Sequence, residues 1–247
     1  DYIPGPYYSF DPSDVDEDDY RNTTLNFALS HLLAAGQESG RTAMRARGDT
    51  EIDGSYQNHS DQTLTALSLF SDNRITRNWQ SRVQLSHATD DLSSDLDGLP
   101  TDRFETRNRQ LAWSNQIETR LGSITLGVEG LWQDLDSNQA YSEDSRRVGS
   151  LVAGYVRALD AHDLQLNLRY DDYSDFGATT TGLLGYGYRI TPQWRVSASY
   201  STAFQAPTFN ELHTMAFAPW YVGNPDLDPS RNTGLDAGIA THLRSCL

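Results

Sequence analysis

The sequence is short of cysteine, of long apolar runs and of basic residues, and each shortage excludes a class of protein. Its single cysteine, Cys246, has no partner within the chain, so a disulfide scaffold is excluded. No apolar run approaches the length of a transmembrane helix, and only 37% of the residues are hydrophobic, with a mean hydropathy of −0.60. The formal net charge of −15 argues against nucleic-acid binding, which requires a basic surface.

Apolar and polar residues instead alternate along the chain with a period of two, which is the pattern of half-buried β-strands. In the clearest segment, residues 163–171, Leu164, Leu166 and Leu168 share one face, and the polar residues between them share the other. About eleven candidate strands follow this pattern: residues 25–33, 42–48, 64–70, 79–87, 107–117, 124–132, 148–156, 163–171, 180–190, 194–203 and 233–241.

The connections between these segments alternate in length. The long polar ones are residues 50–62, 90–105, 135–146 and 204–232, and the short ones are 34–39, 71–78, 119–122, 157–162 and 191–193. Short turns at one end and long loops at the other are typical of outer-membrane barrels, which need an apolar residue only at every second position. The sequence therefore predicts an all-β, antiparallel, up-and-down transmembrane β-barrel, with a soluble antiparallel sandwich as the alternative.

The most specific motif lies between Tyr200 and Pro229. A strand runs into Pro207, which cannot donate to a β-ladder, and a long aromatic loop follows. The motif pieces are Ala203-Phe204-Gln205-Ala206-Pro207, Asn210-Glu211-Leu212 and Gly223-Asn224-Pro225-Asp226-Leu227-Asp228-Pro229. They resemble a hallmark of the TonB-dependent outer-membrane receptors, in which a strand ending in Ala-Pro leads into a long external loop. An ordinary hairpin with a proline-rich loop is the alternative.

This resemblance implies that residues 1–247 form part of a receptor β-barrel in the outer membrane. Barrels of this family are larger and enclose a globular plug that contacts the inner-membrane TonB complex, and neither a plug nor a TonB-contacting segment is visible in the sequence. The chain opens on Asp1 without the features of a signal peptide and ends at Leu247 without the terminal aromatic of a complete barrel. We therefore expect a mature or internal segment that is truncated at both ends.

Acidic residues concentrate in the first expected loops. Asp14, Asp16 and Asp18 alternate along one run, and Asp53 and Asp61 follow after two further strands. Alternating carboxylates in a loop can converge on one hard cation through their oxygens, and they repel one another without it. A solvated acidic surface is the alternative interpretation.

The same acids resemble the calcium site of the cobalamin (vitamin B12) receptors within that family. The resemblance implies Ca²⁺ ligands at Asp1, Asp14, Asp16, Asp18, Asp53 and Asp61, with backbone carbonyls from Ile52 and Gly54. Two departures are that Ile52 replaces an aromatic residue and Asp14 replaces a neutral ligand. Positions matching the substrate contacts of those receptors are Gln57, Thr101 and Asp102.

The resemblance implies a transport protein without enzymatic activity, with cobalamin as the transported ligand. The near alternative is a siderophore receptor of the same family, whose anionic Fe(III) ligands would prefer basic or aromatic loops. Two alternatives from other classes are an outer-membrane barrel hydrolase and a soluble calcium-binding β adhesin. For a hydrolase, the neighbouring Ser86 and His87 would point to opposite faces of a strand and could not act as a pair.

Overall fold

The computed structural model describes residues 20–52, 58–215 and 222–241, which form one antiparallel sheet of eleven strands in sequential order. The strands are β1 (Tyr20–Ala34), β2 (Gln37–Ile52), β3 (Asn58–Thr76), β4 (Trp79–Leu96), β5 (Leu99–Thr119), β6 (Gly122–Ser137), β7 (Ser145–Leu159), β8 (His162–Tyr173), β9 (Gly177–Arg189), β10 (Trp194–Gln205) and β11 (Ser230–Thr241). A short helix, α1 (Phe209–His213), lies between β10 and β11.

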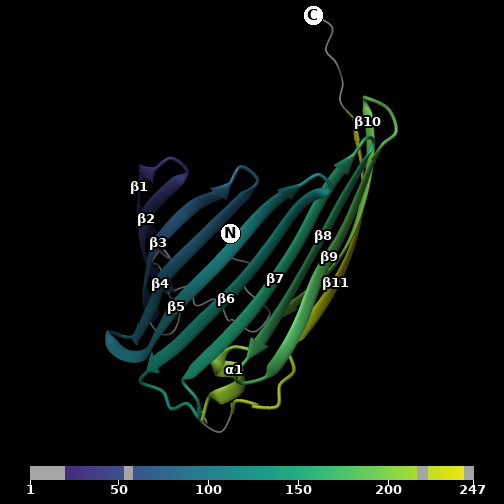
Figure 1. Ribbon diagram of the computed structural model, residues 1–247. Coiled ribbons are helices and arrows are strands. Elements are labelled where there is room, and N and C mark those ends of the chain that lie inside the picture. Colours follow the sequence, from purple (N-terminus) through teal and green to yellow (C-terminus); the bar gives the residue numbers. More distant parts are fainter. Residues whose placement is uncertain (1–19, 53–57, 216–221, 242–247) are drawn as a thin grey trace, which may run out of the picture.

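The strands tilt across a curved sheet that does not close on itself (Figure 1). Among the described strands, β1 and β11 are the two edges, and every other strand is paired on both sides. The predicted all-β, up-and-down architecture and the strand count are therefore confirmed. None of the described helices is long and apolar enough to cross a membrane.

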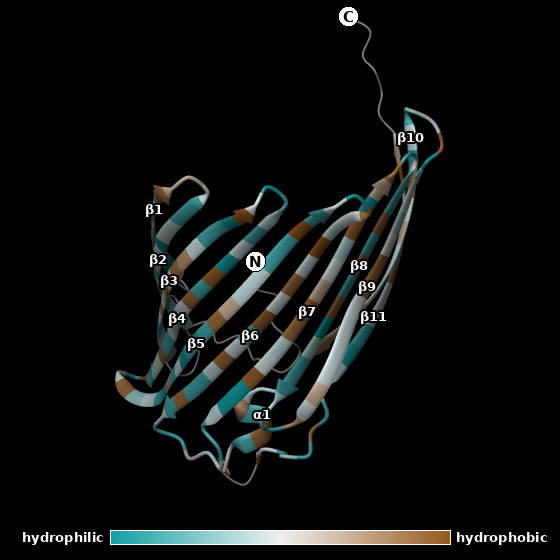
Figure 2. Cartoon of the chain, in the orientation of Figure 1, coloured by the Kyte–Doolittle hydropathy of each residue, from teal (hydrophilic) through white to brown (hydrophobic). Residues whose placement is uncertain are grey.

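Alternation along the strands gives the sheet one apolar and one polar face, visible as alternating bands in Figure 2. The register places Leu166 of β8 opposite Tyr155 of β7 and Leu184 of β9, and all three belong to the apolar face. Their neighbour Asn167 lies on the other face with Arg169. In a transmembrane barrel the apolar face meets lipid and the polar face lines the lumen, so we call them the outward and inward faces.

The connections differ in length between the two ends of the sheet. At one end, here called the short-turn end, tight turns join β1 to β2, β3 to β4 and β5 to β6. At the other, here called the long-loop end, residues 206–229 join β10 to β11, within the predicted range 204–232, and hold α1 (Figure 1). A longer connection at this end also runs over residues 138–144, whereas the predicted loop 50–62 is shortened because β2 continues to Ile52 and β3 begins at Asn58; α1 itself was not expected.

One expected long loop is a tight hairpin instead, so the prediction for residues 90–105 was wrong. Strands β4 and β5 continue to Asp97 and Gly98, which turn the chain with φ angles of 52° and 75°. Asp-Gly with two positive φ angles is the sequence of a type I′ turn, whose twist matches the adjoining strands. The polar composition of this segment reflects strands that project beyond the apolar band.

Candidate functional site

Helix α1 is fixed to the end of β10 by its own capping. Pro207 ends the strand, and Thr208 Oγ1 accepts a hydrogen bond from the Glu211 N–H at 3.2 Å. The Glu211 carboxylate accepts in return from the Thr208 N–H at 2.8 Å, which completes a capping box. That backbone hydrogen bond lowers the pKa of Glu211. The Ala-Pro element therefore sets both where the strand stops and where the helix starts.

Arg146 of β7 joins this segment to the inward face. Its Nε donates to Asp175 Oδ2 at 2.6 Å, and its Nη2 donates to the Pro207 carbonyl at 2.8 Å. The guanidinium also lies 4.9 Å from the centre of the Phe209 ring. Arg146 and Asp175 keep only 6% and 1% of their side-chain surface exposed. One buried ion pair therefore links β7, the β8–β9 turn and the segment before α1.

His213, at the end of α1, lies in the same cluster. Its Nδ1 is 3.3 Å from Ser142 Oγ, and its Nε2 is 3.8 Å from Asp175 Oδ2. The Ser-His-Asp order resembles a hydrolase triad, but the Ser142 hydroxyl also donates to the His213 carbonyl and Asp175 is bonded to Arg146. A triad needs a base that accepts the serine proton and a carboxylate that orients it. The arrangement therefore fits a structural cluster better than a catalytic one.

The Gly-Asn-Pro element packs directly against α1. The Gly223 N–H donates to the Thr214 carbonyl at 2.9 Å, and the Asn224 N–H donates to the Glu211 carbonyl at 2.8 Å. A Cβ added to Gly223 would lie 2.7 Å from the Leu212 carbonyl and the His213 nitrogen, so this close approach requires glycine. The two halves of the sequence motif are thus two sides of one packed unit at the long-loop end.

A pocket of about 420 Å³ lies between this unit and the inward face of β4, β5 and β6. We call it the vestibule pocket. Its apolar lining residues include Leu92, Phe104, Leu135, Pro207 and Phe209; its neutral polar ones include Thr106, Gln133 and Asn210; its charged ones are Asp90 and Arg146. Asp90 accepts a hydrogen bond from Gln62 Nε2 at 2.9 Å. The pocket can therefore offer apolar contacts and neutral hydrogen-bonding groups to a ligand.

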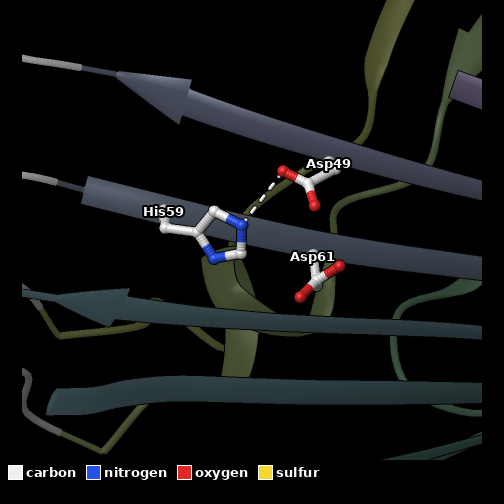
Figure 3. Close-up of side chains that lie close together, drawn as sticks. All are labelled: Asp49, His59 and Asp61. Atoms are coloured by element: carbon white, nitrogen blue, oxygen red, sulfur yellow. Dashed lines mark hydrogen bonds and ion pairs between the residues drawn. The ribbon is translucent and has the colours of Figure 1, made fainter. Parts of the chain in front are cut away.

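A second group of candidate ligating residues, the rim cluster, comprises Asp49 of β2 and His59 and Asp61 of β3 (Figure 3). One ligand atom from each lies within 4.8 Å of the others, close enough to converge on a metal ion after small shifts. His59 Nε2 is 3.0 Å from Asp49, its Nδ1 is 3.2 Å from Asp95, and Asp61 is 3.0 Å from Arg47 Nη2. Hydrogen bonds to Asp49 and Asp95 raise the pKa of His59.

The rim cluster lies on the outward face, because Asp49 pairs with Asp61 on the face that also holds Leu67. Of the predicted calcium ligands, Asp61 belongs to this cluster and Ile52 ends β2, where its backbone pairs with Asn58. The remaining predicted ligands lie outside the described residues: Asp1, Asp14, Asp16, Asp18, Asp53 and Gly54. The predicted substrate contact Gln57 lies outside them as well.

The other two predicted substrate contacts lie in the β4–β5 hairpin. Thr101 Oγ1 donates to the Ser94 carbonyl at 3.0 Å. Asp102 accepts from Gln139 Nε2 at 2.7 Å and lies on the same strand face as Phe104 of the vestibule pocket. The Asn138 side chain also donates to the Thr101 carbonyl at 2.8 Å, so both residues help to hold the β6–β7 connection against the hairpin, and Asp102 is on the inward side.

Sequence reasoning missed the residues that organise this end. His59 was assigned to a loop and lies in β3, and its contact with Asp49 depends on the register of two strands. Arg146 was expected at the end of a loop, but it is the second residue of β7 and lies on the inward face. The arginine partner of Asp175 lies 29 positions earlier in the sequence. No local pattern indicates a contact at that separation.

Comparison with known proteins gives the family. The chain is 22% identical over 242 residues to the vitamin B12 transporter BtuB of Photobacterium profundum, which covers 94% of this chain and 38% of that protein. The chain thus spans well under half the length of this relative.

Solved structures agree on the fold. The siderophore receptor PirA of Pseudomonas aeruginosa matches with a TM-score of 0.72 at 18% identity, over 91% of this chain and 44% of that one. A variant of the ferric enterobactin receptor PfeA of the same species matches with a TM-score of 0.76 at 17% identity, over 92% and 41%. The family model described as TonB dependent receptor-like, beta-barrel matches residues 1–244. This chain therefore belongs to the TonB-dependent receptor β-barrel family of the bacterial outer membrane.

Proposed function

We propose that the parent protein of this chain is a receptor that takes up cobalamin across the outer membrane. The TonB complex would supply the energy through a plug domain, and Ca²⁺ would order the external loops. Family membership supports the transport role, and the match to a vitamin B12 transporter along 94% of the chain supports this ligand. The activity belongs to the whole receptor, of which this chain is a part.

The chemistry of the vestibule pocket is the structural observation that carries the choice of ligand. Cobalamin presents a broad, largely apolar ring with many neutral amide groups, and Thr106, Gln133 and Asn210 offer hydrogen bonds suited to amides. An Fe(III)-siderophore is usually anionic and would meet Asp90, while the charge of Arg146 is already balanced by Asp175. A siderophore receptor remains the alternative within the family.

The calcium proposal is supported by two described carboxylates, Asp49 and Asp61, which lie near one another at the rim. Calcium takes six to eight oxygens at about 2.3–2.6 Å in irregular geometry, which loop carboxylates can supply. Asp61 and Asp49 are adjacent across β2 and β3. We propose that Asp1, Asp14, Asp16, Asp18 and Asp53 join Asp61 around the ion, with carbonyls from Ile52 and Gly54. Asp61 would then exchange its contact with Arg47 for the cation.

The test is a cobalamin titration of the full-length receptor with and without calcium, repeated on an Asp16→Asn, Asp18→Asn, Asp53→Asn triple variant. We expect calcium to tighten cobalamin binding of the wild type by about 5–150-fold, the usual range for coupled sites, and to leave the variant unchanged. A matched control is Asp226→Asn with Asp228→Asn, which removes two exposed acids of another connection at the same end. Equal affinities for wild type and triple variant, neither responding to calcium, would contradict the calcium proposal. Preference for a ferric siderophore over cobalamin would contradict the choice of ligand.

A further inference from the structure

Strand β2 breaks the apolar pattern of the outward face. Arg41 lies on that face between Leu29 of β1 and Leu69 of β3, and Arg45 lies beside Leu25. Both arginines are exposed, as are these leucines. Arg41 is four positions after the start of β2, or about 13 Å along the strand, which is within the height spanned by the apolar residues of the neighbouring strands.

Neither arginine has a hydrogen bond or ion pair within the described part of the chain. Arg47, two positions beyond Arg45 on the same strand face, is paired with Asp61. A charged side chain on the lipid face of a barrel is destabilising, most of all near the middle of the bilayer. The charge of Arg41 is therefore expected to be balanced by an anion from outside the described residues.

A groove of about 350 Å³ lies beside Arg41 on this face. Its lining includes Phe27, Arg41, Ala43, Leu67, Leu69 and Leu85. The small Ala43 leaves space between the larger apolar side chains of β1 and β3. The volume is at the lower end of the range for small-molecule sites, about 300–1,000 Å³. Arg45 does not line the groove.

We propose that this groove binds one phosphate-bearing lipid, with an acyl chain along Ala43 and Leu67 and the phosphate on Arg41. The planar guanidinium of arginine forms paired hydrogen bonds to phosphate, and its long stem can reach from an apolar surface toward the headgroup region. A lipid fits better than a partner protein, because stable protein interfaces bury about 1,200–2,000 Å² and this groove is narrow. The groove also lies on the face of the sheet that meets the membrane lipids.

The test is native mass spectrometry of the full-length receptor in detergent with added phosphatidylglycerol or with diacylglycerol of identical chains, which lacks the phosphate. We expect the wild type to retain phosphatidylglycerol about tenfold more strongly, the gain from a charge-assisted hydrogen bond. Arg41→Gln should abolish this preference, while binding of the acyl chains in the groove persists. Ala43→Leu, which fills the groove, should reduce retention of both lipids.

The matched control is Arg45→Gln, which removes a cation from the same strand and face without touching the groove. It should leave the preference unchanged, and far-UV circular dichroism should show equal β content for all variants. Equal retention of the two lipids by the wild type would overturn the proposal. Equal losses of phosphatidylglycerol retention in Arg41→Gln and Arg45→Gln would also overturn it, because they would indicate a general attraction of the anionic lipid to positive charge on this face. Copurification of an acidic protein that is lost only in Arg41→Gln would favour a protein partner instead.

Discussion

At the scale of single residues, Arg146 is the side chain on which the long-loop end depends most. It is buried, it balances the charge of Asp175, and it satisfies the carbonyl of Pro207. Replacing one member of a buried ion pair is costly because the other charge is left uncompensated. Replacing both members with apolar residues of similar volume is often tolerated.

We therefore predict that Arg146→Met lowers the free energy of unfolding of the full-length receptor by about 3–5 kcal/mol in urea titrations. The double variant Arg146→Met, Asp175→Leu should recover most of that loss. As a control, Arg109 pairs with Asp134 on the exposed surface, so Arg109→Met should cost only about 0–1 kcal/mol. Similar losses for Arg146→Met and Arg109→Met would show that the Arg146 pair is not a buried anchor.

The stability of the rim cluster should depend on pH because of His59. Its pKa is raised by hydrogen bonds to Asp49 and Asp95, so protonation strengthens these contacts. The stabilisation should be complete below the ordinary histidine pKa of about 6.5 and lost as pH rises through the raised value. Hydrogen exchange at the β2–β3 ends, corrected for the intrinsic pH dependence, should therefore accelerate with rising pH. His59→Gln should remove this dependence and His87→Gln should not; an unchanged profile in His59→Gln would contradict the assignment.

At the scale of elements, the sequence pattern was sufficient for the number of strands and their faces but not for the strand ends, since β4 and β5 extend through a predicted loop. Period-two alternation is a local signal, so segments such as residues 163–171 could be assigned, with the correct face for Leu166, from neighbouring residues alone. Turn chemistry was the weaker signal: Asp97 and Gly98 were included in a long loop because the surrounding residues are polar. Contacts set by register, such as Asp49 with His59, require pairing that local patterns do not give.

The packed unit formed by α1 and the Gly-Asn-Pro element gives a prediction at this scale. Gly223→Ala would place a Cβ 2.7 Å from the backbone of Leu212, which the helix cannot relieve by a side-chain movement. We expect a loss of about 1–3 kcal/mol in unfolding free energy, as for other overpacked sites. Limited proteolysis should cleave the β10–β11 connection faster in this variant.

Gly149 of β7 is the matched control, because a Cβ there would meet no atom within 4 Å. Gly149→Ala should change the free energy of unfolding by less than about 0.5 kcal/mol, as for ordinary surface substitutions. If Gly223→Ala is as stable and as resistant to protease as Gly149→Ala, the two motif halves do not form one packed unit.

At the scale of the whole molecule, the open sheet is the feature with the largest consequence. The edge strands β1 and β11 each have one neighbour among the described strands, so their outer N–H and C=O groups need further partners. Such groups cannot remain unsatisfied within lipid, and exposed edges pair readily with other chains. We predict that the isolated chain aggregates in plain buffer, whereas the full-length receptor remains dispersed in detergent. Sedimentation of both samples tests this, and a monodisperse, β-rich monomer of the isolated chain that unfolds sharply would contradict it.

As part of a membrane-spanning barrel, this sheet has lipid on one face and a polar lumen on the other. The most direct measurement is a spin-label scan of residues 163–171 of β8, using single cysteines in the full-length receptor with Cys246→Ser, reconstituted in lipid. Accessibility to oxygen, which concentrates in lipid, should peak at Leu164, Leu166 and Leu168. Accessibility to a water-soluble nickel complex should be higher at Gln165 and Asn167, giving the period of two that the register requires. Uniform accessibility to either probe along β8 would contradict the account.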